Sequence, residues 1–335
     1  MHQRTISPKS DYSKATTLNS IQLLRAVACL MVVIHHALSL VENKYVAVGA
    51  AGVDVFFVIS GFVMVIATKA NESSVIFIKK RFIKVVPMYW IATVLTIIFY
   101  YYRHGEIIVW EHIATSLLFL PPPEHLIVPV LYPGWSLNYE MFFYLIIAIA
   151  LLSRKNTFLY VIVVVCALGS LGHKTGIHFI DYYIYDGLLE FCAGVVIGIT
   201  YKHGVRISQT AGVFLFTCAI LIFSVNYSYP TISKAIYWGI PSVLIVVAFL
   251  TFEKSGVARN VVGLEIGAAS YTMYLFHPFV IWSIEWQFGN QPGIFFVIGA
   301  VVTSVVISLV LYRLLEAPLN KGLRKLAISS ARVNT

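Results

Sequence analysis

Charged side chains are scarce in this chain: only 12% of its 335 residues are Asp, Glu, Lys or Arg, whereas 59% are hydrophobic. A typical soluble domain carries about 25% charged residues. A single soluble core cannot hide so much apolar surface, so lipid must solvate much of it, and we expect an integral membrane protein.

Cysteine and histidine patterns that hold metals or disulfides are also lacking. The four cysteines lie inside apolar runs without CxxC spacing, which favours small buried hydrophobes. The ten histidines are scattered and show no HExxH motif. The sequence therefore predicts neither a disulfide framework nor a bound metal.

Long polar stretches are absent as well, and the longest gap between apolar runs is the loop 103–137. Any chemistry is therefore expected within the membrane bundle or at its edges. No cleavable signal peptide is expected, because residues 1–18 are polar and the first apolar run is long enough to span. No internal repeat of the kind many transporters carry is visible.

Apolar runs predict an all-α, polytopic membrane bundle of about ten transmembrane helices. The expected spans are 20–41, 49–69, 85–102, 138–152, 157–171, 187–202, 209–226, 236–252, 269–287 and 292–314. Segment 109–120 is too short to span and precedes three prolines, so we interpret it as an interfacial or re-entrant piece. The expected organisation is a tail over 1–18, a membrane domain over 19–318 and a tail over 319–335.

The basic residues predict the orientation. With the N-terminus in the cytoplasm, the ten spans place 19 Lys and Arg residues on the cytoplasmic side and 4 on the other, with Arg25 inside the first span. Such a bias is typical of cytoplasmic loops and puts both termini in the cytoplasm. It also explains the net charge of +9 without a nucleic-acid partner.

Ionisable residues inside membrane spans cost about 2.5–3.5 kcal/mol or more and are usually functional. Arg25 and His36 are 11 residues apart in the first span. That spacing is within about 20° of three full turns, so both lie on one face, ~16 Å apart along the axis, whereas His35 is roughly 80° away. The structural alternatives are an interfacial anchor for Arg25 and a hydrogen-bonded histidine for His36. We favour the interpretation that the two residues form a functional pair.

Further polar residues lie in or beside the next two spans. Asp54, in the run GVDVFFVISGF, requires a cation or backbone donors as its partner. Ser60 and Gly61 in the same run allow close helix approach. Arg81 and Lys84, just before a proline, share a helical face and indicate either ordinary cytoplasmic anchoring or an anion site for phosphate groups.

The fourth and tenth spans each carry a carboxylate. We expect Ser136 to cap the helix over 138–152, with Glu140 just inside it as an acid, a base, an orienting group or a structural partner. Arg313 and Glu316 are expected to pair with each other at i, i+3 as a structural contact.

The ninth span carries polar residues that drift slowly around one face: Tyr271, Tyr274 and His277. His277 precedes Pro278 and lies well inside the expected span. Its alternative explanation is a hydrogen bond that stabilises a proline kink.

Together these segments resemble the acyltransferase-3 family of membrane acyltransferases, in particular its exopolysaccharide-modifying, ExoZ-like branch. The likeness runs from about Leu18 to Pro318 and rests on five motifs in family order. These are the R-x10-H pair Arg25 and His36, GVDVFFVISGF, Arg81-x-x-Lys84 before Pro87, WSLNYEMFFY and SYTMYLFHP. Lys84 departs from the family's second arginine and loses the planar fork that binds phosphate through two hydrogen bonds.

The resemblance implies transfer of an acyl group, usually acetyl, from cytoplasmic acetyl-CoA to a hydroxyl of a bacterial surface glycan, an exopolysaccharide or its lipid-linked precursor. It implies an inner-membrane location with ten core spans. The expected partners are acyl-CoA as a co-substrate, not a tightly bound cofactor, together with a glycan acceptor and membrane lipid.

For the acyl donor, the hypothesis is that its negative charges bind to basic side chains. The nucleotide phosphates would bind the basic cluster Lys79, Lys80, Arg81 and Lys84. Arg25 would contact the donor deeper in the bundle, where the pantetheine arm threads toward His36.

At the reacting end, His36 would act as general base on the acceptor hydroxyl, and a covalent acyl-histidine is an open variant. Asp54 or Glu140 would orient His36 or stabilise its cation. The candidate substrate-binding residues are Trp135, Ser136, Tyr271, Tyr274 and His277, among which Tyr271 and His277 line the acceptor side or polarise the thioester carbonyl.

Two other classes also explain buried polar residues. A transporter or flippase for a glycan lipid would move substrate without consuming acyl-CoA. A structural subunit of a polysaccharide assembly complex would tolerate replacement of His36, Arg25 or Glu140. Release of CoA from acetyl-CoA separates these readings.

Overall fold

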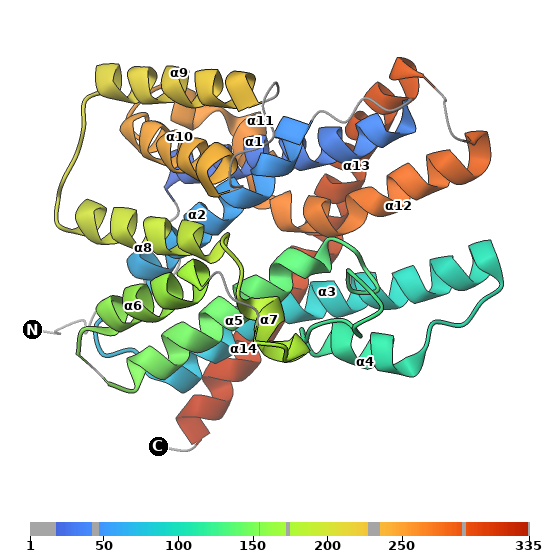
Figure 1. Cartoon of the computed structure of the whole chain (residues 1–335), viewed down its shortest axis with the longest axis horizontal. Helices are drawn as coiled ribbons and strands as arrows, with labels where there is room; N and C mark the ends of the chain where they lie inside the picture. The colour runs from blue at the N-terminus through green and yellow to red at the C-terminus, as the bar shows by residue number, and fades with distance from the viewer. Residues whose placement is uncertain are drawn as a thin grey trace, which may run out of the picture.

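The computed structural model describes residues 18–41, 47–153, 155–171, 175–226, 235–289 and 293–333. Within these ranges the chain is helix and loop without a strand, which confirms the all-α class (Figure 1). The expected tail over 1–18 lies outside the described residues, apart from Leu18.

The α-helices are α1 (Asn19–Ala37), α2 (Ala51–Ala67), α3 (Ser74–His104), α4 (Trp110–Leu117), α5 (Gly134–Leu151), α6 (Thr157–Ser170), α7 (His178–Tyr183), α8 (Leu188–Lys202), α9 (Gln209–Asn226), α10 (Ile240–Thr251), α11 (Val261–Ala268), α12 (Ser270–Phe288), α13 (Ile294–Leu311) and α14 (Ala317–Val333). Short segments join them: the 3₁₀ turns η1 (Leu38–Leu40), η2 (Ala47–Ala50) and η4 (Val257–Arg259), and the π-helical η3 (Ala235–Gly239) and η5 (Tyr312–Glu316).

Each expected span coincides with a helix, namely α1, α2, α3, α5, α6, α8, α9, α10, α12 and α13. Four helical stretches are long and apolar enough to cross a membrane: Asn19–Ala37, Ser74–His104, Gly134–Leu151 and Ile294–Leu326. Shorter apolar helices cover Ala51–Ala67, Thr157–Ser170, Gln209–Ser224 and Ile236–Thr251. A membrane location is therefore supported, while the number of ten spans and their orientation stay predictions.

The outward face of α13 illustrates why lipid suits this bundle. Phe295, Val302, Val306 and Val310 are all exposed, at helical spacing. The opposite face of the helix is buried and consists of smaller residues, namely Val297, Ala300, Ser304 and Ser308. An apolar stripe that faces outward is the pattern of a helix solvated by lipid.

Two helices begin earlier than expected. The basic run before Pro87 is part of α3, which starts at Ser74 and passes through the proline. A proline removes only one backbone donor, so a long helix held by its neighbours continues. The expected cap at Ser136 is wrong, because α5 already begins at Gly134 and the Ser136 hydroxyl donates to the Pro133 carbonyl, at 3.2 Å.

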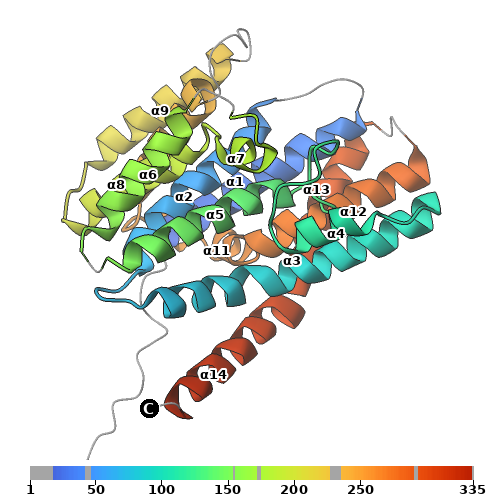
Figure 2. The same ribbon diagram turned by 60° about the horizontal axis from the view of Figure 1, so that its bottom comes forward.

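The segment expected to be interfacial contains the eight-residue helix α4, which the Trp90 indole fastens to α3 by donating to the Leu117 carbonyl, at 2.9 Å. At the other end of the chain, the expected tail over 319–335 is helical as far as Val333. Figure 2 shows this helix, α14, projecting away from the bundle.

The seam between α2 and α8 depends on two glycines. A Cβ on Gly61 would lie 2.1 Å from the Phe191 carbonyl oxygen, and one on Gly194 would lie 2.1 Å from the Val58 carbonyl oxygen. The close approach expected at Gly61 is thus confirmed, because small residues let membrane helices pack backbone to backbone. Ser60 has another role and donates to Glu140, at 2.9 Å.

We therefore predict that Gly61→Ala lowers stability by about 1–3 kcal/mol, the usual cost of overpacking a filled interior. The added methyl forces α2 and α8 apart, since the atom it meets is backbone. Thermal unfolding of the purified protein in detergent measures the effect. Gly299→Ala in α13 is the control, because a Cβ there meets nothing within 4 Å, and an equal loss in both variants would contradict the prediction.

Candidate functional site

Arg25 and His36 of α1 both contact side chains of α12. The Arg25 Nε donates to the Ser270 hydroxyl, at 3.2 Å. Further along, the His36 Nδ1 lies 3.2 Å from the His277 Nε2. Ser270 and His277 are about two turns apart on α12, so the stripe predicted on α1 lies along one neighbouring helix.

A cavity of about 130 Å³ lies where α1, α2, α3, α5 and α12 meet. Two of its walls carry cations, Arg25 on α1 and both Arg81 and Lys84 on α3, and a third wall carries the carboxylate of Glu140 on α5. Its other polar lining residues are Ser60, Ser136, Tyr144, Ser270, Tyr271 and Tyr274. The excess of positive charge favours an anionic ligand.

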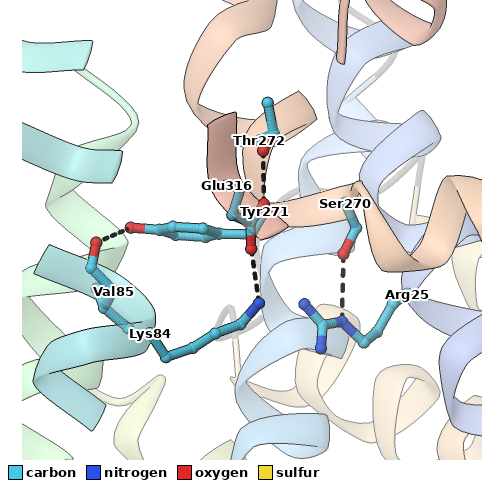
Figure 3. A network of polar contacts seen from close by, with 7 residues as sticks. All are labelled: Arg25, Lys84, Val85, Ser270, Tyr271, Thr272 and Glu316. Atoms are coloured by element: carbon cyan, nitrogen blue, oxygen red, sulfur yellow. Dashed lines mark hydrogen bonds and ion pairs between the residues drawn. The ribbon is translucent and has the colours of Figure 1, made fainter. Parts of the chain in front are cut away.

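Lys84 is anchored by a buried ion pair (Figure 3). Its ammonium donates to the Glu316 Oε1, at 2.7 Å, and the Thr272 hydroxyl donates to the other Glu316 oxygen, at 2.5 Å. The Tyr271 hydroxyl donates to the Val85 carbonyl, at 2.7 Å, and so ties α12 to α3 beside the pair. These contacts hold the Lys84 side chain at the cavity wall.

Glu140 is held by two hydroxyl groups inside the same cavity. Ser60 donates to its Oε1 from α2, and Tyr144 donates to the same oxygen from one turn further along α5. The Arg81 guanidinium lies over the rings of Phe77 and Tyr144, at 5.4 and 5.9 Å from their centroids. Arg81 thus stacks on aromatic faces at the cavity wall.

The second part of the site is a pair of imidazoles. The His36 and His277 rings are stacked with centroids 5.1 Å apart, and the Tyr132 hydroxyl lies 3.3 Å from the His277 Nε2. The His277 Nδ1 lies 3.2 Å from the Met273 carbonyl oxygen. His277 is fully buried, at 0% exposure, whereas His36 is only partly buried.

Tyr274 links the cavity to the imidazole pair. Its hydroxyl lies 2.7 Å from the Ser136 hydroxyl at the cavity wall, and its ring centroid is 6.2 Å from that of His277. His36 and His277 themselves do not line the cavity. The arrangement places a cationic cavity, which could hold an anion, next to two imidazoles, which can accept protons, with a tyrosine and a serine at the boundary.

Several expected site residues lie outside the cavity lining. Lys79 and Lys80 are exposed near the start of α3, and Lys80 pairs with Glu72. Asp54 is fully buried in α2. Trp135 packs edge-on against an aromatic group, with ring centroids 6.3 Å from Phe57, 6.1 Å from Tyr139 and 6.2 Å from Tyr185.

The expected Arg313–Glu316 pair is wrong. Arg313 reaches Glu265, at 2.5 Å, and Glu316 reaches Lys84. Both residues lie in the π-helical segment η5, whose wider turn does not bring residues three apart onto one face. This segment turns Glu316 into the bundle, where its exposure is 0%.

Sequence reasoning also missed the role of Tyr132, in the loop before α5, and that of Tyr144. The only signal for Tyr132 is its place directly before Pro133 and Gly134, which end the loop. Tyr144 is one turn beyond Glu140, so the i, i+4 spacing is a usable signal.

Comparisons with known proteins agree with this picture. The model of a family described as an acyltransferase domain matches residues 18–313. A protein of Rhizobium meliloti (strain 1021), named exopolysaccharide production protein ExoZ, is 34% identical over 297 residues, which cover 83% of this chain and 91% of that protein. No solved structure matches.

The Lys84–Glu316 pair generates a prediction about stability. Removing one partner of a buried ion pair typically costs ~3–5 kcal/mol. Because the Lys84 side chain is 31% exposed, we expect Lys84→Met to cost only on the order of 2 kcal/mol. The uncompensated Glu316 carboxylate is the cause.

The double variant Lys84→Met with Glu316→Gln should regain part of this loss, because it leaves no buried charge without a partner. Thermal unfolding of the wild type, both single variants and the double variant gives the coupling energy. Strictly additive losses would show that the pair contributes no coupling.

Proposed function

This chain belongs to the acyltransferase family, and from that premise we propose that it moves an acetyl group from cytoplasmic acetyl-CoA to a hydroxyl of an exopolysaccharide or its lipid-linked precursor. The acceptor class is proposed from the printed name of the similar Rhizobium protein, which is one of exopolysaccharide production. We place the enzyme in the bacterial inner membrane with ten spans and both termini in the cytoplasm, following the charge bias of the loops.

The observation that carries the proposal is a cationic cavity next to an imidazole pair, with α1 and α12 contributing side chains to both. Arg25 borders the cavity and His36 contacts His277, and both reach α12 from one stripe of α1. A transporter requires no such base beside an anion site. An acyl transfer from an anionic thioester to an alcohol requires both.

The size of the cavity favours a particular placement of the donor. At about 130 Å³ it is smaller than the ~300–1,000 Å³ pockets that enclose drug-sized ligands. Only the thioester end of acetyl-CoA enters, along Arg25. The nucleotide phosphates bind nearer the start of α3. There Arg81 and Lys84 line the cavity, and Lys79 and Lys80 are exposed just before them in the helix.

The proposed reaction uses His36 as the general base. Its imidazole takes the proton of the acceptor hydroxyl as the oxygen attacks the thioester carbonyl. The C–S bond then breaks, the new ester C–O bond remains, and the proton on His36 passes to the departing sulfur to give CoA thiol. Tyr274 and Ser136 line the cavity, with the Tyr274 ring next to that of His277, and in this mechanism they would contact the reacting groups.

We expect His36→Ala to lower the rate of acetyl transfer by about 10²–10⁴-fold, the usual contribution of a positioned base. The measurement is CoA thiol release from acetyl-CoA by purified protein, with and without a glycan extract as acceptor. His203→Ala, at an exposed position after α8, is the matched control and retains the rate. Normal transfer by a folded, inserted His36→Ala protein would refute the proposed mechanism.

The anion site gives a second expectation. Removing one charged hydrogen-bond donor to phosphate costs about 1.5–3 kcal/mol, so Arg81→Ala should raise the KM for acetyl-CoA roughly tenfold or more with a smaller effect on kcat. Lys79→Ala and Lys80→Ala should raise KM less, and added salt should erase that smaller effect, because exposed charges are screened.

Initial rates over a range of acetyl-CoA concentrations, at low and high salt, separate these effects. Arg206→Ala is the control, because Arg206 stacks on Tyr201 at the end of α8, with its guanidinium 3.5 Å from the ring centroid. An unchanged KM in Arg81→Ala would remove Arg81 from the donor site.

A further inference from the structure

We propose that His277 is the positioning residue that sets the tautomer of His36, so that the Nε2 of His36 is the nitrogen that accepts the proton of the substrate hydroxyl. The inference rests on the proposed role of His36 as base. It assigns the orienting role to a neutral imidazole instead of a carboxylate. Three contacts in the imidazole pair carry the argument.

The first step concerns His277 alone. Its Nδ1 lies 3.2 Å from the Met273 carbonyl oxygen, one turn earlier in α12. A carbonyl oxygen only accepts hydrogen bonds, so the Nδ1 carries the proton. In a neutral imidazole the other nitrogen is then an acceptor, and a cation is costly here because His277 is fully buried in an apolar bundle.

The second step derives the protonation of His36 on α1 from that of His277. The His277 Nε2 lies 3.2 Å from the His36 Nδ1. Since the His277 Nε2 accepts, the His36 Nδ1 donates and carries the proton of that ring. The backbone of Val32, one turn earlier in α1, also hydrogen-bonds His36. The His36 Nε2 is therefore the unprotonated nitrogen, as a general base requires.

Tyr132 adds a second donor to the same atom. Its hydroxyl lies 3.3 Å from the His277 Nε2, and its ring is 5.1 Å from that of His36. A hydroxyl that donates to this nitrogen keeps it in its acceptor form, and Tyr132 and His36 share its single lone pair. The loop before α5 thus supports the same tautomer as the helix backbone does.

Exposure separates the roles of the two rings. His36 is partly exposed and can contact the hydroxyl of an acceptor substrate, whereas His277 has no exposed surface. The buried ring therefore orients and the accessible ring reacts. The Glu140 carboxylate, expected from the sequence as one candidate for orienting His36, instead accepts from Ser60 and Tyr144.

A neutral orienting group has a chemical advantage in this place. The His36 Nδ1–H bond to His277 persists when the Nε2 takes up the hydroxyl proton, so the ring does not rotate during the reaction. The resulting cation is short-lived, because its Nε2 proton passes to the departing sulfur. No permanent buried anion has to be maintained beside the base between turnovers.

The test compares two variants of His277. His277→Leu removes the nitrogen that accepts the hydrogen bond and keeps a side chain of similar size, whereas His277→Gln retains a side-chain oxygen that can accept a hydrogen bond. We expect His277→Leu to lower kcat by about 10²-fold with a nearly unchanged KM for acetyl-CoA. We expect His277→Gln to retain clearly more activity than His277→Leu. A purely structural role would lower both alike, in step with thermal stability.

The decisive readout does not require turnover. In ¹⁵N-histidine-labelled protein in detergent, the His36 signals are assigned by their loss in His36→Ala. The wild type should show a protonated Nδ1 and an unprotonated Nε2, and His277→Leu should shift His36 toward the other tautomer. The control is His203→Ala, whose exposed ring lies after α8, and it should leave the His36 signals unchanged.

The outcomes separate the two proposals. If His36→Ala abolishes transfer but His277→Leu changes neither kcat nor the His36 tautomer, this inference is overturned and the role of His36 stands. If His36→Ala transfers normally, the proposed function fails whatever His277 does. If His277→Leu does not insert, His277→Gln decides: a partial loss of kcat together with a shift of His36 toward the other tautomer supports the inference, whereas a loss of kcat with an unchanged tautomer overturns it.

Discussion

An ionisable side chain in a bundle solvated by lipid must find its partner inside the protein, and the centre of this molecule is organised by that requirement. Glu316 joins the end of α13 to α3 through Lys84 and to α12 through Thr272. Arg25 joins α1 to the start of α12 through Ser270. These contacts bring α1, α3 and α12 to one level, and the cavity lies at that level.

The polar interior has two chemically distinct ends. Fixed charges surround the cavity, where three cations from α1 and α3 outnumber the carboxylate of Glu140. Beyond Ser136 and Tyr274 the polar groups are neutral rings and a phenol. In the proposed mechanism, the region that attracts anions is thus kept apart from the base, whose basicity neighbouring cations would otherwise reduce.

The sequence was sufficient where the determining geometry is local. Helical periodicity places Arg25 and His36 on one stripe of α1. Each span expected from the apolar runs coincides with a helix. Motif order identifies the acyltransferase family, which the match over residues 18–313 confirms.

Tertiary choices were not readable in the same way. Glu316 has an obvious local partner in Arg313, yet a π-helical turn sends it to Lys84, more than two hundred residues away in the chain. The position of Tyr132 depends on how a long loop returns over the bundle, which no periodicity encodes. Lys79 and Lys80 share a basic run with Arg81 and Lys84, but they are exposed near the start of α3 and do not line the cavity.

The glycine seam between α2 and α8 has a mechanical consequence. Ser60 faces the cavity from the residue directly before Gly61, whose backbone is pressed against that of α8. Because the two backbones are already in contact, this wall cannot move away from the cavity without displacing α8 as well. The walls made by α3 and α12 are joined differently, because Tyr271 of α12 donates its hydroxyl to the Val85 carbonyl of α3 and Lys84 of α3 pairs with Glu316 of η5. Widening the cavity on that side requires only a change of side-chain rotamers, not the separation of two packed backbones.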